Sequence, residues 1–261
     1  MRSLSIGATG MLAQQLNVDV ISNNIANMTT TGYKRQRAEF QDLLYQSLRR
    51  VGSASSDNGT IVPSGVQIGA GVQAAAVYRI HEQGNMQVTD NPLDIAISGD
   101  GFFQIELPNG ETAYTRAGSF QISPEGAVVT ADGYPVIGPG GIPEDAVEIQ
   151  VNESGEILVA IDGQIEPQNV GQFELANFAN EAGLQAIGDN LFLETPASGN
   201  AIIGMPAAAG FGSIKQGMLE TSNVNIVSEI TQLISAQRAY EMNSKVITAA
   251  DEMMRSVSNL R

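Results

Sequence analysis

The last forty residues of the chain, SNVNIVSEITQLISAQRAYEMNSKVITAADEMMRSVSNLR (222–261), contain neither glycine nor proline. Large side chains recur there every seven residues, at Ile226, Leu233, Tyr240, Ile247 and Met254. A second row lies three residues further on, at Ala236, Asn243, Ala250 and Val257. The repeat predicts one helix with a wide apolar stripe, capped by Ser222 or Asn223. About 35 residues is roughly three times the usual helix length, which favours a coiled coil or bundle over the last helix of a globular core.

The amino-terminal end carries a similar pattern. Leu4, Met11, Val18 and Ile25 are also spaced by seven residues, and a run of Asn and Thr follows up to Gly32. Asn and Thr are poor helix-interior residues and glycine often follows a helix end, so a helix is expected to stop in this run. Two amphipathic helices most simply bury their stripes against each other. The expected helical interface consists of Met11, Val18, Ile25, Ile226, Leu233, Tyr240, Ile247 and Met254.

Asn23, Asn24 and Asn27 form an amide cluster where the first helix is expected to end. Asn side chains commonly hydrogen-bond nearby backbone, which makes a capping and turn cluster one interpretation. The other interpretation places these amides in the helical interface, where they would hydrogen-bond across subunits.

The middle of the chain predicts β-structure. Short runs rich in β-branched and aromatic residues end at turn pairs such as Asn109-Gly110 and Asp132-Gly133. Such runs at this spacing predict an antiparallel sandwich or barrel from about Val77 to Met205. The predicted strands are 102–107, 113–116, 120–122, 127–130, 147–151 and 157–161. The expected fold class is therefore α+β, with long terminal helices paired as a coiled-coil-like base and a central antiparallel β domain.

The segment between the first helix and the β domain, Tyr45 to Ala76, is rich in Gly, Ser and Asn. A flexible linker is its simplest interpretation. The alternative is an arm at 46–63 that contacts a neighbouring molecule, with Arg49, Arg50, Asp57 and Asn58 as contact residues. The expected organisation is a discontinuous helical domain (1–30 and 222–261), a connecting region (31–75 and 206–221) and a β domain (76–205).

Composition excludes several kinds of site. The chain has no Cys and a single His, His81, so thiolate sites and multi-histidine metal sites cannot form. His81 precedes Glu82, and the two are expected to form a surface pair rather than a catalytic one. The net charge is −15, which argues against binding nucleic acid or an anionic membrane. No apolar run approaches the ~20 residues that span a bilayer. We expect no catalytic residue, cofactor or metal.

Three stretches resemble one family. The first comprises Ala8-Thr9-Gly10-Met11-Leu12-Ala13-Gln14-Gln15, Ile21-Ser22-Asn23-Asn24-Ile25-Ala26-Asn27 and Thr31-Gly32-Tyr33-Lys34. The second comprises Thr221-Ser222-Asn223-Val224-Asn225 and Ala236-Gln237-Arg238-Ala239-Tyr240-Glu241. The third is central: Asn91-Pro92-Leu93-Asp94 through Asp100-Gly101-Phe102-Phe103, with Tyr114-Thr115-Arg116-Ala117-Gly118. Together they resemble bacterial flagellar rod and hook proteins over nearly the whole chain.

The resemblance implies a structural subunit that polymerises helically with itself, not an enzyme. It implies a rigid drive shaft in the flagellar basal body that crosses the periplasm and outer membrane. Its implied partners are other rod proteins and the hook protein along the axis, the periplasmic and outer-membrane rings around it, and the flagellar export apparatus, which would secrete the chain without a cleaved signal peptide. Direct membrane insertion and nucleic acid are not implied.

Within the family, the chain length and the segment 45–63 favour a distal rod subunit. A proximal rod protein of similar length and the hook protein are the alternatives. Outside the family, a secreted β-rich carbohydrate-binding protein or hydrolase remains the competing class.

Overall fold

The computed structural model describes residues 2–49, 64–161 and 166–259. The chain forms two compact units. The helical unit comprises residues 1–25, 36–78 and 225–261, and the β unit comprises 26–35 and 79–224. An N-terminal helix, a C-terminal helix and a central antiparallel β region confirm the predicted α+β class.

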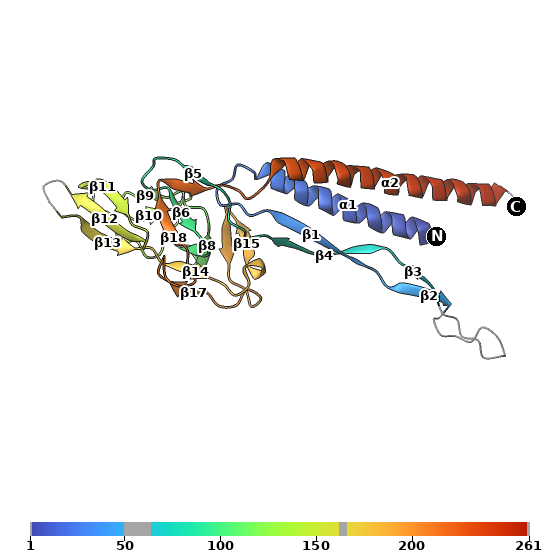
Figure 1. Ribbon diagram of the computed structural model, residues 1–261, viewed down its shortest axis with the longest axis horizontal. Helices are drawn as coiled ribbons and strands as arrows, with labels where there is room; N and C mark the ends of the chain where they lie inside the picture. The colour runs from blue at the N-terminus through green and yellow to red at the C-terminus, as the bar shows by residue number, and fades with distance from the viewer. Residues whose placement is uncertain (1, 50–63, 162–165, 260–261) are drawn as a thin grey trace. The chain divides into compact units, whose positions relative to one another are not determined.

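The helical unit is built on α1 (Arg2–Ala26) and α2 (Ile226–Asn259), which lie side by side in Figure 1. Gly7 of α1 faces Ile247 of α2, Gly10 faces Asn243, and Asn24 hydrogen-bonds Glu229. Residue numbers rise along one helix while they fall along the other, so the helices are antiparallel.

The predicted cap of α2 is wrong by two or three residues. The helix begins at Ile226, and the Asn225 side-chain oxygen accepts a hydrogen bond from the Ser228 N–H at 3.2 Å. Asn223 does not cap the helix because its side-chain oxygen accepts a hydrogen bond from the Arg35 N–H in the β unit, while its NH₂ group donates to the Ile80 and Glu82 carbonyls.

The segment predicted as a flexible linker contains strands. In the helical unit β1 (Gln36–Asp42) pairs with β4 (Val72–Arg79), and β2 (Tyr45–Arg49) pairs antiparallel with β3 (Val66–Gly69). The linker interpretation is therefore wrong for 45–49 and for 66–76. β3 and β4 are exposed along much of their length, so their apolar residues do not mark one buried face, which is the signal that identifies a half-buried strand.

The β unit confirms all six predicted strands to within two residues at each end. They are β7 (Phe102–Glu106), β8 (Thr112–Thr115), β9 (Gln121–Ile122), β10 (Val128–Val129), β11 (Ala146–Val151) and β12 (Glu156–Ile161). The unpredicted strands are β5 (Met86–Val88), β6 (Ile95–Ser98), β13 (Gln168–Gln172), β14 (Leu175–Asn177), β15 (Gln185–Gly188), β16 (Leu191–Leu193), β17 (Ile202–Gly204), β18 (Ser213–Gln216) and β19 (Met218–Glu220). A short 3₁₀ helix, η1 (Glu181–Gly183), precedes β15.

The strands form several antiparallel sheets. The largest has the order β15-β16-β8-β7-β14-β17, and β11, β12 and β13 form a second. The late strands β18 and β19 pair with the early strands β6 and β5, and β10 pairs with β9. The first two strands of the β unit are thus paired with its last two strands.

Two apolar clusters fill the β unit, and β7 contributes to both. Phe103 packs with Phe120 and Phe173, at ring-centroid distances of 5.1 and 5.8 Å. The preceding residue, Phe102, belongs to the other cluster, with Phe178. Successive strand residues point to opposite faces of a sheet, so one strand serves two cores.

Candidate assembly site

The two helices contact each other along one row of residues on α2. On α2, Glu229, Ala236 and Ala250 are buried. A Cβ added at Gly10 of α1 would lie only 2.8 Å from Asn243 Nδ2. The row Glu229, Ala236, Asn243 and Ala250, spaced by seven residues, therefore faces α1, and we call it the contact row. Ala236 and Ala250 in this row are small, and small residues let two helix backbones approach closely.

The predicted interface residues flank the contact row. Leu233 and Ile247 on α2 are partly buried, as are Met11, Val18 and Ile25 on α1. Ile226, Tyr240 and Met254, by contrast, are 41–43% exposed. The largest apolar side chains of the stripe are thus incompletely covered by the helix pair.

Further apolar residues lie on the side of α2 that faces away from the contact row. Val227, Ile230 and Ile234, spaced by three and four residues, are 76%, 45% and 46% exposed. Helical periodicity places them on one face. Sequence reasoning missed this face because it selected the row with the longest unbroken repeat. The signal was present in Val227 and Ile230, which the seven-residue row omits.

Asn24 joins three segments of the helical unit. Its side chain is almost completely buried. Its amide donates to the Gln36 carbonyl at 2.8 Å and to Glu229 Oε2 at 3.2 Å, and its oxygen accepts from the Gln36 N–H at 2.8 Å. Asn24 thus fixes the start of β1 and the first turn of α2 to α1. Asn27 accepts a hydrogen bond from Thr30 in the turn after the helix, whereas Asn23 is exposed.

The predicted contact arm is only partly described. Arg49 is the last residue of β2. Arg50, Asp57 and Asn58 lie outside the described residues.

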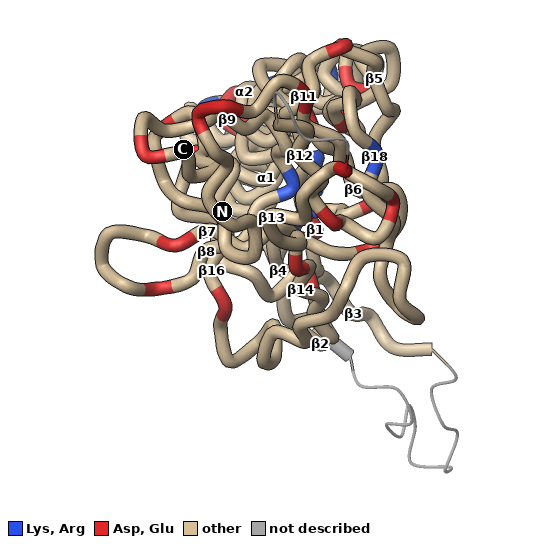
Figure 2. The backbone as a smooth tube through the Cα atoms, turned by 90° about the vertical axis from the view of Figure 1, so that its left-hand side faces the viewer, with Lys and Arg blue, Asp and Glu red and all other residues tan. Residues whose placement is uncertain are grey.

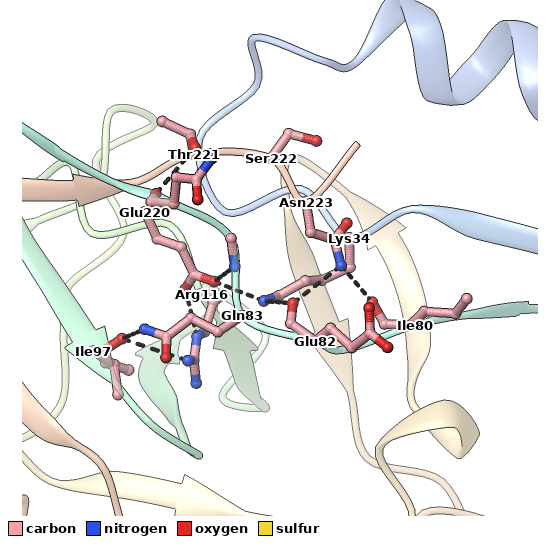
Figure 3. Close-up of polar contacts among 12 residues, drawn as sticks. Lys34, Ile80, Glu82, Gln83, Ile97, Arg116, Glu220, Thr221, Ser222 and Asn223 are labelled. Atoms are coloured by element: carbon pink, nitrogen blue, oxygen red, sulfur yellow. Dashed lines mark hydrogen bonds and ion pairs between the residues drawn. The ribbon is translucent and has the colours of Figure 1, made fainter. Parts of the chain in front are cut away.

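The β unit contains a buried charge cluster formed by Lys34, Arg116 and Glu220 (Figure 3). Lys34 Nζ lies 2.7 Å from Glu220 Oε1, and Arg116 Nε lies 2.7 Å from Glu220 Oε2. The three side chains are no more than 5% exposed. The Gly84 N–H also donates to Glu220 Oε1, at 2.8 Å, so both carboxylate oxygens are hydrogen-bonded.

Glu220 is the shared counter-charge of the two cations in this cluster. Burial alone would raise the pKa of Glu220, but the Arg116 and Lys34 charges and their hydrogen bonds outweigh it, so the pKa lies below its ordinary value. Arg116 also donates to the Gly99 and Gly101 carbonyls, and Lys34 donates to the Glu82 carbonyl. These hydrogen bonds replace the hydration that the two cations lose on burial, which offsets part of the desolvation cost of a buried ion pair.

The cluster ties together the two places where the chain enters and leaves the β unit. The Gly32 N–H donates to the Glu220 carbonyl at 2.8 Å, and the Arg35 N–H donates to the Asn223 side chain at 2.7 Å. A Cβ at Gly32, where φ is 67°, would lie 2.7 Å from the Ala117 nitrogen. Lys34, Arg116 and Asn223 come from the three stretches that carry the family resemblance, so segments remote in sequence meet here (Figure 3).

The prediction that His81 forms a surface pair is wrong. Its ring packs edge-on against Phe102 and Phe192, at centroid distances of 5.6 and 5.7 Å. Burial, with the charges of Lys34, Arg79 and Arg116, lowers the pKa of His81 to about 4. The ring is therefore neutral at pH 7, and among the described residues its Nδ1 has no hydrogen-bond partner.

Other chemistry is sparse in the part of the chain that is described. No group of three or more His, Asp or Glu side chains there could hold a metal ion. Neither described helix is long and apolar enough to cross a membrane. A groove of about 420 Å³ in the β unit is lined by Asp90 and Glu148 among apolar and amide groups.

These observations define a class: an α+β protein whose terminal helices pair and still leave apolar faces exposed. Exposed apolar faces of this kind are typical of protein–protein contact sites. Comparison with known proteins gives the family. Residues 4–34 match the flagella basal body rod protein family, 96–159 the flagellar hook protein FlgE/F/G D1 domain, and 215–260 the flagellar basal body rod FlgEFG protein C-terminal family.

The chain is also similar to whole proteins. It is 61% identical to the flagellar basal-body rod protein FlgG of Caulobacter vibrioides, with all of both chains covered. It is 55% identical to FlgG of Agrobacterium fabrum, over 99% of this chain and 98% of that one. The flagellar hook-basal body complex protein FlhP of Bacillus subtilis is 30% identical over the full length of both. The chain belongs to the flagellar basal-body rod protein family.

Proposed function

We propose that the chain is a structural subunit of the flagellar distal rod, without enzymatic activity. It polymerises helically into a rigid shaft that carries torque from the motor to the hook and turns inside the outer rings. Support comes from the names of the relatives and from their sequence identity to this chain. The identity is 61% to the FlgG of Caulobacter vibrioides and 30% to FlhP, which favours the distal rod over another axial protein. Rod and hook proteins are its axial partners. Ring proteins, the export apparatus and a position across the periplasm and outer membrane belong to the same proposal.

The observation that carries the proposal is the exposed face of α2 formed by Val227, Ile230 and Ile234. α1 occupies the contact row on the other side of this helix, so a second apolar face needs another partner. In a helical polymer, the neighbouring subunit provides it through a head-to-tail contact. The partly exposed Ile226, Tyr240 and Met254 would be covered in the same way.

Asn24 has a positioning role in this proposal. Its hydrogen bonds keep α1, β1 and α2 in one arrangement and so present the assembly face. The arm residues Arg49, Arg50, Asp57 and Asn58 stay predicted contacts to a neighbouring subunit.

The test is substitution on the exposed face. Ile234→Glu should raise the protein concentration needed for polymerisation at least about tenfold, because a side chain of this size contributes roughly 1.5–3 kcal/mol when buried. Gln232→Glu adds the same charge to an exposed site on the opposite side of the same helix, two residues before Ile234, and is the matched control. Polymer can be measured by sedimentation and by electron microscopy, and helix content by circular dichroism. Unchanged polymerisation of the Ile234 variant would remove the basis of the proposal.

A further inference from the structure

The six-stranded sheet of the β unit ends in a strand with exposed apolar side chains. β17 pairs with β14 through Ala176 and Ile203 and is the last strand in the sheet order. Its Ile202 and Ile203 are 59% and 56% exposed, and Met205 just beyond it is 61% exposed. Edge strands normally carry charges or proline that prevent pairing with other chains. We call Ile202, Ile203 and Met205 the β17 edge.

The surroundings of this edge differ in charge from the rest of the unit. The β unit has five basic and twenty acidic side chains, whereas the helical unit has eight of each. Figure 2 shows acidic positions, drawn in red, distributed over many loops. From Thr195 to Ile214, however, the sequence contains no charged residue, and this is the longest such run between 79 and 224.

The loop after the β17 edge has a fixed shape despite its exposure. The Ala207 N–H donates to the Gly212 carbonyl and the Phe211 N–H to the Ala208 carbonyl, at 2.9 and 3.0 Å. Ala207 has φ of 61°, an unfavourable conformation for a residue with a Cβ. The Phe211 ring lies against Gly204, where a Cβ would be only 2.2 Å from it. A surface ordered in advance loses little entropy on binding.

We propose that the β17 edge is a contact between the β unit of one subunit and a neighbouring copy of this chain. The inference rests on the proposed function, which brings copies together. Copies with a net charge of −15 per β unit repel each other. A contact is therefore least costly at a surface without acidic side chains, where no like charges are brought together and no hydrated carboxylate loses its water. The contact is head-to-tail, because an edge pairing with itself would close a dimer and stop growth.

The first test is substitution in the full-length chain. Ile203→Asp places a carboxylate at the edge, and Val147→Asp places one at an apolar position that is even more exposed, at 72% against 56%, on β11 of the same unit. The expected result is a critical concentration about tenfold or more higher for Ile203→Asp and little changed for Val147→Asp. Equal effects of both variants, or no effect of either, would overturn the inference.

The second test uses the absence of cysteine from the chain. Ile203→Cys is labelled with a benzophenone maleimide, assembled, irradiated and digested. The expected product is a crosslink to a peptide of another copy outside 195–214. A crosslink only to a different protein of purified basal bodies, a crosslink between two 195–214 segments, or a label that stays uncrosslinked in the polymer would each overturn the inference. Wild-type chains that never polymerise would instead refute the proposed function together with it.

Discussion

Glu220 shows how much one side chain can organise. It accepts hydrogen bonds from Lys34, Arg116 and the Gly84 N–H, and its carbonyl accepts one from Gly32. The sequence offered a partial signal, since Arg116 and Lys215 are the only basic residues between 81 and 220. Nothing local could pair Arg116 or Lys34 with Glu220, because a salt bridge between residues 186 positions apart leaves no pattern in a single sequence.

Replacing Glu220 by Gln should lower the free energy of unfolding of the β unit by about 3–5 kcal/mol, because two buried cations lose their counter-charge. Chemical denaturation followed by far-ultraviolet circular dichroism measures this. Glu153→Gln is the matched control: Glu153 pairs with Lys215 in an exposed position, where ion pairs contribute about 0–1 kcal/mol. Similar losses in both variants would contradict the structural role given to the cluster.

His81 should make the β unit sensitive to acid. Its pKa of about 4 in the folded chain lies below the ordinary value of 6.5, so the unfolded chain binds a proton at His81 more tightly than the folded chain does. Its contribution is fully present above pH 6.5 and is lost as the pH falls from 6.5 through 4. The loss amounts to about 3 kcal/mol. His81→Phe keeps a ring between Phe102 and Phe192 and should flatten this part of the stability–pH profile measured by denaturation. A profile as steep as that of the wild type would assign the acid sensitivity to other groups.

At the scale of elements, hydrophobic periodicity predicted both helices and the strands that end in tight turns. It placed Ala236, Asn243 and Ala250 in the apolar stripe but assigned the interface to the row of larger side chains, because small residues such as Ala236 and Ala250 contribute little to hydrophobic periodicity. It also missed β18 and β19, whose partners β6 and β5 lie more than a hundred residues earlier.

Gly10 provides a test of the helix contact. Gly10→Leu should lower the free energy of unfolding of the helix pair by about 1–3 kcal/mol, because a side chain at this position meets Asn243. Leu favours the helix over glycine by up to ~1 kcal/mol, so helix propensity alone predicts that the substitution stabilises the helix pair. Ala8→Leu, at an exposed position two residues away, is the control. The ellipticity at 222 nm during heating distinguishes the two predictions.

The whole molecule combines a neutral helical unit with a β unit of net charge −15. Repulsion between β units should oppose polymerisation at low salt. Raising the ionic strength from ~0.01 to ~1 M shortens the Debye length from about 30 to about 3 Å, so the critical concentration should fall. Light scattering across a salt series measures it. A critical concentration that rises with salt would mean that attractive ion pairs dominate the contacts.

The pairing of Lys34 with Glu220 also fixes an order of events during synthesis. A ribosome adds roughly 5–20 residues per second, so 186 residues separate the two partners by roughly 10–40 s. During that interval β5 and β6 have been made, but β19 and β18 have not. The β unit therefore closes only when its last strands emerge, and β5 and β6 wait for their partners while more than a hundred residues are added.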